Sequence, residues 1–144
     1  MNPDRDRLLA LAALHVEAIA LRAGATRARV VRTGTGPRRA SAAATRLIDD
    51  ASARRCGAVA VVGVCGALDP TLQPGDLIVA DSVLDSSGNL VAELPAAALL
   101  AQGLRGHGMR VRVGPILSGD RIVSGSAARA AMVARGAVAG RSPL

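Results

Sequence analysis

Continuous apolar runs alternate with amphipathic stretches along most of the chain. Residues 8–14 and 58–64 are apolar throughout, which is typical of strands covered on both faces. The second run favours a central place in a sheet. Further strands are predicted at 27–33, 77–84 and 109–117, and helices at 16–23, 37–55, 96–105 and 127–135, with Ser126 as the N-cap of the last helix.

The alternation of strands and helices predicts the fold class. It favours an α/β fold of three layers, with a mainly parallel or mixed central sheet between helices. Nothing resembling a linker or a repeat interrupts the sequence, so we expect a single domain over residues 1–144. Ligands bind such sheets beyond the carboxyl ends of the strands. Four stretches follow predicted strands and are candidates for such a site: Glu17, 34–36, 63–68 and 118–123.

The composition narrows the possible partners. Because Phe, Tyr and Trp are absent, the core must consist of aliphatic side chains, and no ring of these three residue types is available to stack on a base. The net charge is +7, and all 18 basic residues are arginines. These arginines are scattered and form no nucleic-acid motif, so we expect no nucleic-acid partner; a basic nucleic-acid-binding domain is an alternative that rests on charge alone.

The cysteines and the N-terminal residues bear on the compartment. Cys56 and Cys65 lack the spacing of a metal site, and we expect neither a metal nor a cofactor. Two thiols in an alanine-rich chain fit a reducing cytoplasm. The first apolar run is broken by His15 and Glu17 and is too short to span a membrane, so we expect a cytoplasmic protein without a membrane span.

The most specific motif lies after the second apolar run. Residues 63–70 read GVCGALDP and residues 73–76 read QPGD. Taken alone, they predict two β-turns around a short insertion. Their spacing also resembles the signature of the nucleoside phosphorylase and nucleosidase superfamily, which includes purine nucleoside phosphorylases and methylthioadenosine/S-adenosylhomocysteine nucleosidases.

Three more segments resemble this superfamily in the same order: AALHVE at 12–17, TGTGPRRA at 33–40 and SGDRIV at 118–123. The resemblance covers about residues 8–139, and its details are similar to the hopanoid-associated phosphorylase-like branch. Glycines such as Gly34 and Gly36 let an anion or a sugar hydroxyl approach the backbone, although a tight strand-to-helix turn is the simpler explanation of this pair.

The resemblance implies a function and a set of site residues. The function is cleavage of the N-glycosidic bond of a purine nucleoside or a related compound, with phosphate as a second ligand in the phosphorylases. Glu17 matches the glutamate that helps to activate the attacking water in the nucleosidases. The resemblance also implies a substrate pocket at Gly36, Cys65, Gly66, Ile122 and Val123.

Several positions depart from the family pattern. Val64 stands where the family has a ribose-side Ser or Thr, and Ile122 stands where the nucleosidases have a purine-stacking Phe. Residues 136–139 match a stretch after which the family continues to a ribose-binding Glu and an acidic Asp that protonates the base. We therefore expect a C-terminally truncated chain that lacks a last strand and helix.

Two expectations follow from the departures. The first is weak or no cleavage. General acid catalysis contributes about 10²–10⁴-fold to the rate, and the acid that supplies it in the family is missing from the expected truncated chain. The alternative is a catalytically dead homologue that binds only a nucleoside-like ligand or a partner subunit. The second expectation is a homodimer or, failing that, a poorly soluble monomer, because an incomplete sheet would expose an apolar edge.

Overall fold

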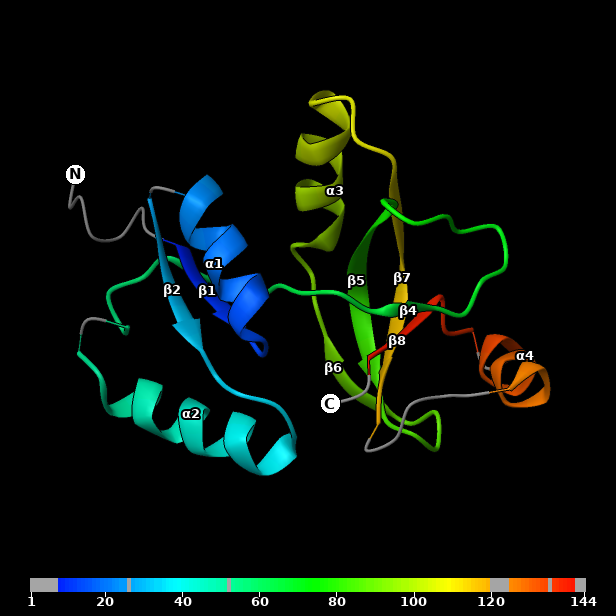
Figure 1. The fold of residues 1–144 in the computed structure, drawn as a ribbon, viewed down its shortest axis with the longest axis horizontal. Helices are drawn as coiled ribbons and strands as arrows, with labels where there is room; N and C mark the ends of the chain where they lie inside the picture. The colour runs from blue at the N-terminus through cyan, green and yellow to red at the C-terminus, as the bar shows by residue number, and fades with distance from the viewer. Residues whose placement is uncertain (1–7, 26, 52, 120–124, 135, 142–144) are drawn as a thin grey trace. The chain divides into compact units, whose positions relative to one another are not determined.

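The computed structural model describes residues 8–25, 27–51, 53–119, 125–134 and 136–141. The chain forms two compact units, Met1–Val64 and Cys65–Pro143. In Figure 1 the elements of the first unit run from blue to cyan-green, and those of the second run from green to red.

The first unit is a three-stranded parallel sheet in the order β2-β1-β3. Leu8 of the middle strand is level with Ala28 on one side and with Ala58 on the other. The helix α1 packs against β1 and β2. The elements are β1 (Leu8–Ala12), α1 (His15–Gly24), β2 (Ala28–Arg32), α2 (Pro37–Asp49) and β3 (Ala58–Val61).

The second unit is a five-stranded mixed sheet in the order β4-β8-β7-β5-β6. The strand β7 is parallel to both of its neighbours, and the outer pairs β4–β8 and β5–β6 are antiparallel. The helix α3 packs on β5 and β7. The elements are β4 (Gly66–Ala67), β5 (Leu77–Leu84), β6 (Leu90–Glu93), α3 (Ala97–Gly106), β7 (Val111–Ser118), α4 (Ser126–Ala134) and β8 (Ala139–Arg141).

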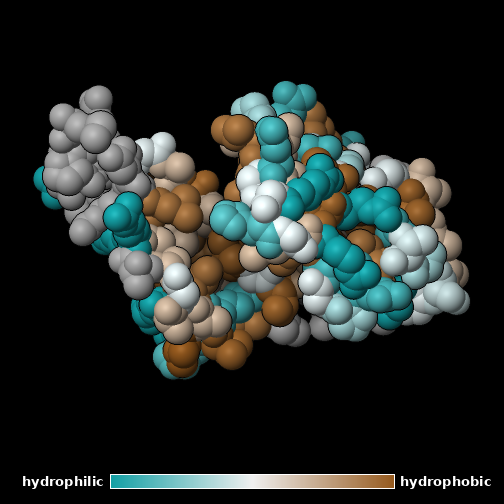
Figure 2. All heavy atoms as spheres, turned by 90° about the horizontal axis from the view of Figure 1, so that it is seen from above, coloured by the Kyte–Doolittle hydropathy of each residue, from teal (hydrophilic) through white to brown (hydrophobic). Residues whose placement is uncertain are grey.

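Small side chains form the core of each unit, as the absence of aromatic residues requires. In the second unit one cluster joins Val79 to Ala97 and Ala101, and another joins Leu68 to Leu117 and Ala137. Each small residue buries little apolar area. Many larger aliphatic side chains are exposed at the surface, where they contribute to the brown spheres in Figure 2. The buried apolar residues in the described part of the first unit are Leu9, Ala10, Ala12, Ala18, Ala43 and Ala53.

The prediction of a central strand at 58–64 is wrong in two respects. The strand β3 ends at Val61, and it is an outer strand of its sheet, in which β1 is the middle strand. Val59 is 62% exposed and Val61 is 71% exposed. The ladder ends because the backbone N–H of Val64 donates to the side chain of Glu17 instead of to another strand.

Other predicted boundaries also need correction. The helix α2 ends at Asp49 instead of Arg55, and Asp50 pairs with Arg29 of β2 at 2.6 Å. Ser126 is the first residue of α4 and not its N-cap, since the N–H of Arg129 donates to the carbonyl of Gly125. The sequence prediction missed β4, β6 and β8, which have two, four and three residues and are too short for a periodic pattern.

The α/β fold class is confirmed. Parallel and antiparallel strands occur together, and all four predicted helices form. The expectation of a single domain over residues 1–144 stays a prediction.

Candidate functional site

The carboxylate of Glu17 is the buried charged group in the described part of the first unit. Its residue lies in the first turn of α1, directly beyond β1, and is 7% exposed. Its Oε2 accepts hydrogen bonds from the backbone N–H groups of Ala13 at 3.1 Å and Leu14 at 2.9 Å. The N–H groups at a helix start have no partner within the helix, so a glutamate at this position satisfies them locally.

The other oxygen of Glu17 reaches a different strand. Its Oε1 accepts from the backbone N–H of Val64 at 2.9 Å. Two residues earlier, the N–H of Val62 still donates to the carbonyl of Leu11 in β1. The carboxylate therefore fixes the backbone beyond β3 to the start of α1, and each of these three hydrogen bonds is charge-assisted.

The glycine turn after β2 lies at the same edge of this sheet. The backbone N–H of Thr33 donates to the carbonyl of Ala12 at 2.8 Å, which holds the end of β2 beside the end of β1. Gly34 and Gly36 come next with φ of 81° and 89°, values that favour glycine. The helix α2 then begins at Pro37, with its N-terminus at the turn. The carboxyl ends of β1 and β3 thus meet at Glu17 through the residues bonded to it, and the end of β2 is bonded to Ala12 of β1 at the same edge.

Two of the predicted substrate residues belong to the second unit. Cys65 is exposed and precedes β4, and Gly66 pairs with Gly140 of β8. The structure brings Glu17 together with the strand ends of the first unit and places Cys65 and Gly66 at one end of β4. Ile122 and Val123 lie outside the described residues.

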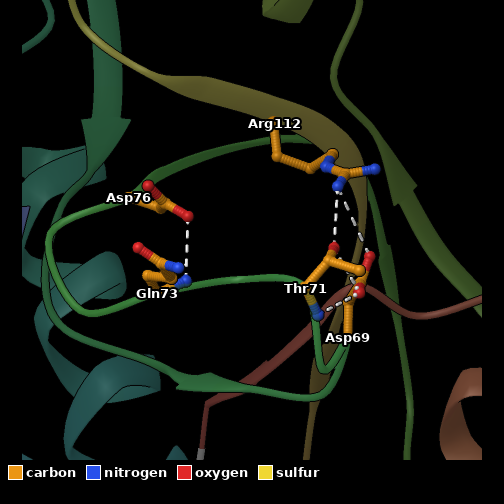
Figure 3. A network of polar contacts seen from close by, with 5 residues as sticks. All are labelled: Asp69, Thr71, Gln73, Asp76 and Arg112. Carbon is orange, nitrogen blue, oxygen red and sulfur yellow. Dashed lines mark hydrogen bonds and ion pairs between the residues drawn. The ribbon is translucent and has the colours of Figure 1, made fainter.

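Sequence reasoning missed a polar network in the second unit, which Figure 3 shows. Asp69 Oδ1 accepts from the side chain of Thr71 at 2.6 Å and from its backbone N–H at 2.8 Å. Arg112 of β7 donates to Thr71 Oγ1 at 3.0 Å and lies 3.7 Å from Asp69 Oδ2. These hydrogen bonds from Thr71, and the charge of Arg112, lower the pKa of Asp69 below its ordinary value.

A signal for this network is present in the sequence. An Asp two residues before a Thr favours a local turn in which the carboxylate accepts from the backbone. The partner on β7 carries no such signal, because its approach depends on how distant strands pair.

With the geometry established, comparison with known proteins gives the family. The family model described as the phosphorylase superfamily matches residues 13–139. The chain belongs to the phosphorylase superfamily. None of the curated proteins compared with it matches.

Solved structures of a futalosine hydrolase and of nucleosidases have the same fold as this superfamily member. A futalosine hydrolase mutant of Helicobacter pylori matches with a TM-score of 0.78 and 18% identity, over 95% of this chain and 79% of that chain. An MTAN mutant of Helicobacter pylori, with 5′-methylthioadenosine in the active site, matches with a TM-score of 0.76 and 18% identity, over 95% and 75%.

A third structure extends this likeness to another genus. The S-adenosylhomocysteine nucleosidase of Streptococcus pyogenes matches with a TM-score of 0.73 and 18% identity, over 95% of this chain and 73% of that chain. At this level of identity the three likenesses concern the fold. They confirm the phosphorylase/nucleosidase type of α/β architecture.

Proposed function

We propose that this phosphorylase-superfamily chain cleaves the N-glycosidic bond of a purine nucleoside or a related compound. The observation that carries the proposal is the buried Glu17 carboxylate at the carboxyl ends of three parallel strands. This is where α/β sheets bind their ligands. The structurally similar Helicobacter pylori MTAN mutant holds 5′-methylthioadenosine in its active site, which supports a nucleoside as the ligand class.

The chemistry assigned to the site is a substitution at the anomeric carbon of the sugar. An oxygen nucleophile forms a bond to C1′, and the bond from C1′ to the base nitrogen breaks with its electron pair going to the base. The proton that the nucleophile loses ends on the leaving base. Glu17 would act on an attacking water by orienting it and stabilising the positive charge that develops on its oxygen. Gly36, Cys65, Gly66, Ile122 and Val123 are proposed to line the substrate pocket.

Phosphate is proposed as the nucleophile alongside water. The turn before α2 supports it. Gly34 and Gly36 have no side chain to keep an anion away from the backbone N–H groups, and the N-terminus of the helix favours an anion. The first turn of α2 carries no acidic residue, and its Arg39 side chain lies over Gly34, where an added Cβ would be 3.0 Å from Arg39 Cδ.

A second candidate function is a homologue that binds a nucleoside-like ligand or a partner subunit without cleaving. The observation that favours it is that the carboxylate of Glu17 already accepts three backbone N–H groups. Val64 also offers no side-chain hydrogen bond to a ribose. On this second candidate, cleavage by the chain is weak or absent.

Three finer properties belong to the same proposal. The protein is proposed to belong to the hopanoid-associated phosphorylase-like branch, on the basis of residues 32–40 and 66–70, and to act in the cytoplasm as a homodimer. Within the described residues, every helix is too short or too polar to cross a membrane.

Incubation of the purified chain with 5′-methylthioadenosine or inosine, with and without phosphate, tests the proposal. Chromatography of the products separates the free base, the free sugar and the sugar 1-phosphate. Release of base is expected, with sugar 1-phosphate in the phosphate arm if phosphate attacks and free sugar if water attacks. Saturable nucleoside binding without release of base would favour the second candidate function and contradict the first.

A further inference from the structure

Two arginines of the second unit hold the two ends of one loop. The loop, residues 69–76, makes up all but the first residue of the segment 68–76 that connects β4 to β5. Arg110 directly precedes β7 and Arg112 is the second residue of that strand, so the two side chains lie on the same face. Both contact this loop, each at a different end.

The first contact holds the beginning of the loop. Arg112 donates to Thr71 Oγ1 at 3.0 Å, and the Thr71 hydroxyl donates in turn to Asp69 Oδ1 at 2.6 Å (Figure 3). A hydroxyl that accepts from a cation and donates to a carboxylate is polarised in one direction, which strengthens both hydrogen bonds.

The second contact holds the end of the loop. Arg110 Nη2 lies 2.8 Å from Asp76 Oδ1, and Asp76 Oδ2 accepts from the backbone N–H of Gln73 at 2.9 Å. The N–H of Leu77 donates to the carbonyl of Arg110 at 3.0 Å. The loop is thus attached to β7 before and after its turn.

The proposed substrate residues lie a few positions before the first contact. Cys65 and Gly66 are followed by Ala67, and Gly66–Ala67 is the whole of β4. A strand of two residues has few hydrogen bonds of its own, so its position depends on the residues directly after it. The N–H groups of Leu68 and Asp69 both donate to the carbonyl of Val138, at 3.1 and 3.2 Å, and Leu68 is buried.

We propose that Arg112 is a positioning residue for the substrate site, because its contacts with Asp69 and Thr71 hold β4 and thereby fix Cys65 and Gly66. The proposal rests on the proposed function, since it concerns the binding of the nucleoside. It assigns Arg112 no contact with the substrate.

Steady-state kinetics with 5′-methylthioadenosine test this role. The variant Arg112→Ala is expected to raise KM by about 2- to 5-fold, in keeping with the modest strength of half-exposed charge pairs, and to leave kcat unchanged. Thr71→Val, which keeps the volume of the side chain but removes the hydroxyl, is expected to raise KM in the same direction. Arg112→Lys retains a charged donor and should recover part of the loss. Arg129→Ala on α4 removes the same charge in the same unit and should leave KM unchanged.

Salt provides a readout that a purely structural role would not move. Raising the NaCl concentration screens the attraction between Arg112 and Asp69, so the KM of the wild type is expected to rise towards that of Arg112→Ala. The KM of Arg112→Ala should not depend on salt. The substrate is uncharged, so steering does not contribute. A KM of Arg112→Ala equal to that of the wild type, or the same salt dependence in both proteins, overturns the proposal.

Amide hydrogen exchange separates this proposal from the proposed function. Exchange at Leu68 is expected to be faster in Arg112→Ala than in the wild type, whether or not the chain cleaves nucleosides. Unchanged exchange at Leu68 overturns the role of Arg112 in holding β4. Failure of the wild type to cleave or bind any nucleoside, with exchange at Leu68 changed, overturns the proposed function and with it the link from the loop to a substrate.

Discussion

Glu17 and Gly36 show how single residues shape the edge of the first sheet. Glu17 is one of two glutamates in the chain, and its burial is compatible with a charge because three backbone N–H groups surround it. Gly36 contributes through its backbone instead, since its φ of 89° is one that side chains with a Cβ avoid. Both residues hold the strand ends in the geometry that the proposed site needs.

Substitution of Gly36 tests this backbone requirement. Gly36→Ala is expected to lower the free energy of unfolding by about 1–3 kcal/mol, because the φ of 89° and ψ of 153° at this position are a combination that residues other than glycine hardly ever adopt. No heavy atom lies within 4 Å of the added Cβ, so the effect would be conformational and not steric. Urea denaturation measures it.

The matched control is Gly103→Ala in α3, which also meets no atom within 4 Å and has no positive φ. It should stabilise the protein by about 0.5–1 kcal/mol, the helix preference of alanine over glycine. Equal free energies of unfolding for the two variants would contradict the account of Gly36.

At the scale of the element, turns held by aspartates connect the strands of the second unit. Between β5 and β6, Asp85 accepts from the backbone N–H groups of Ser87 and Asn89, at 2.8 and 2.9 Å, and from the Asn89 side chain at 3.0 Å. The backbone and side-chain hydrogen bonds of Asn89, together with those of Ser87 and Gly88, lower the pKa of Asp85 below its ordinary value. The hairpin is therefore sensitive to acid.

The sign of the pH dependence comes from this lowered pKa. The contribution of Asp85 to stability is fully present above the ordinary carboxyl pKa of about 3.9 and is lost as the pH falls through the lower value in the folded protein. Protection of the Ser87 amide from exchange should persist at pH 5 and decrease only in stronger acid. Loss of protection already above pH 5, or the same acid response in Asp85→Ala, is the result that would contradict this account.

Much of the element order was predictable from the sequence, and the reasons for the failures are physical. The strand at 77–84 and the helices near 16–23 and 96–105 form as the apolar patterns predict. The predicted length of α2 was too great, because the helix ends just before Asp50, whose side chain makes a long-range contact with Arg29. The prediction of a central position for β3 was wrong, because an apolar run indicates strand propensity but not how many neighbouring strands will pair with it.

The candidate site was predictable in part. Glu17 and Gly36 were found from their places after strands, and the structure puts both at the carboxyl edge of the first sheet, where a ligand site was expected. The hydrogen bond from Val64 to Glu17 spans 47 positions, and the contact of Arg112 with Thr71 spans 41. No local pattern contains such pairs.

At the scale of the whole molecule, the net charge and the exposed apolar surface have opposite effects on the proposed association of two copies. Leu90 and Val91 on the outer strand β6 are 56% and 64% exposed, and Leu99 and Leu100 on α3 are 74% and 52% exposed. An outer strand with apolar side chains is a template for pairing with another chain. The net charge of +7 opposes this pairing, because two copies repel each other.

Sedimentation equilibrium tests the proposed homodimer. The wild type is expected to associate, and more strongly as salt screens the repulsion between copies. Val91→Lys should weaken association by placing a charge on the outer strand, whereas Ala128→Lys on α4 adds the same charge elsewhere and should have less effect. A monomer at all protein and salt concentrations would contradict the homodimer.

The central claim, that Glu17 serves N-glycosidic cleavage, is tested most directly by the rate of purine release from 5′-methylthioadenosine in three proteins. The wild type is expected to release free base. Glu17→Gln should be slower by about 10²–10⁴-fold, the usual contribution of such a group. The other glutamate provides the control, since Glu93→Gln on the exposed strand β6 should match the wild type. Equal rates for the wild type and Glu17→Gln, or no release of base by the wild type, would contradict the account.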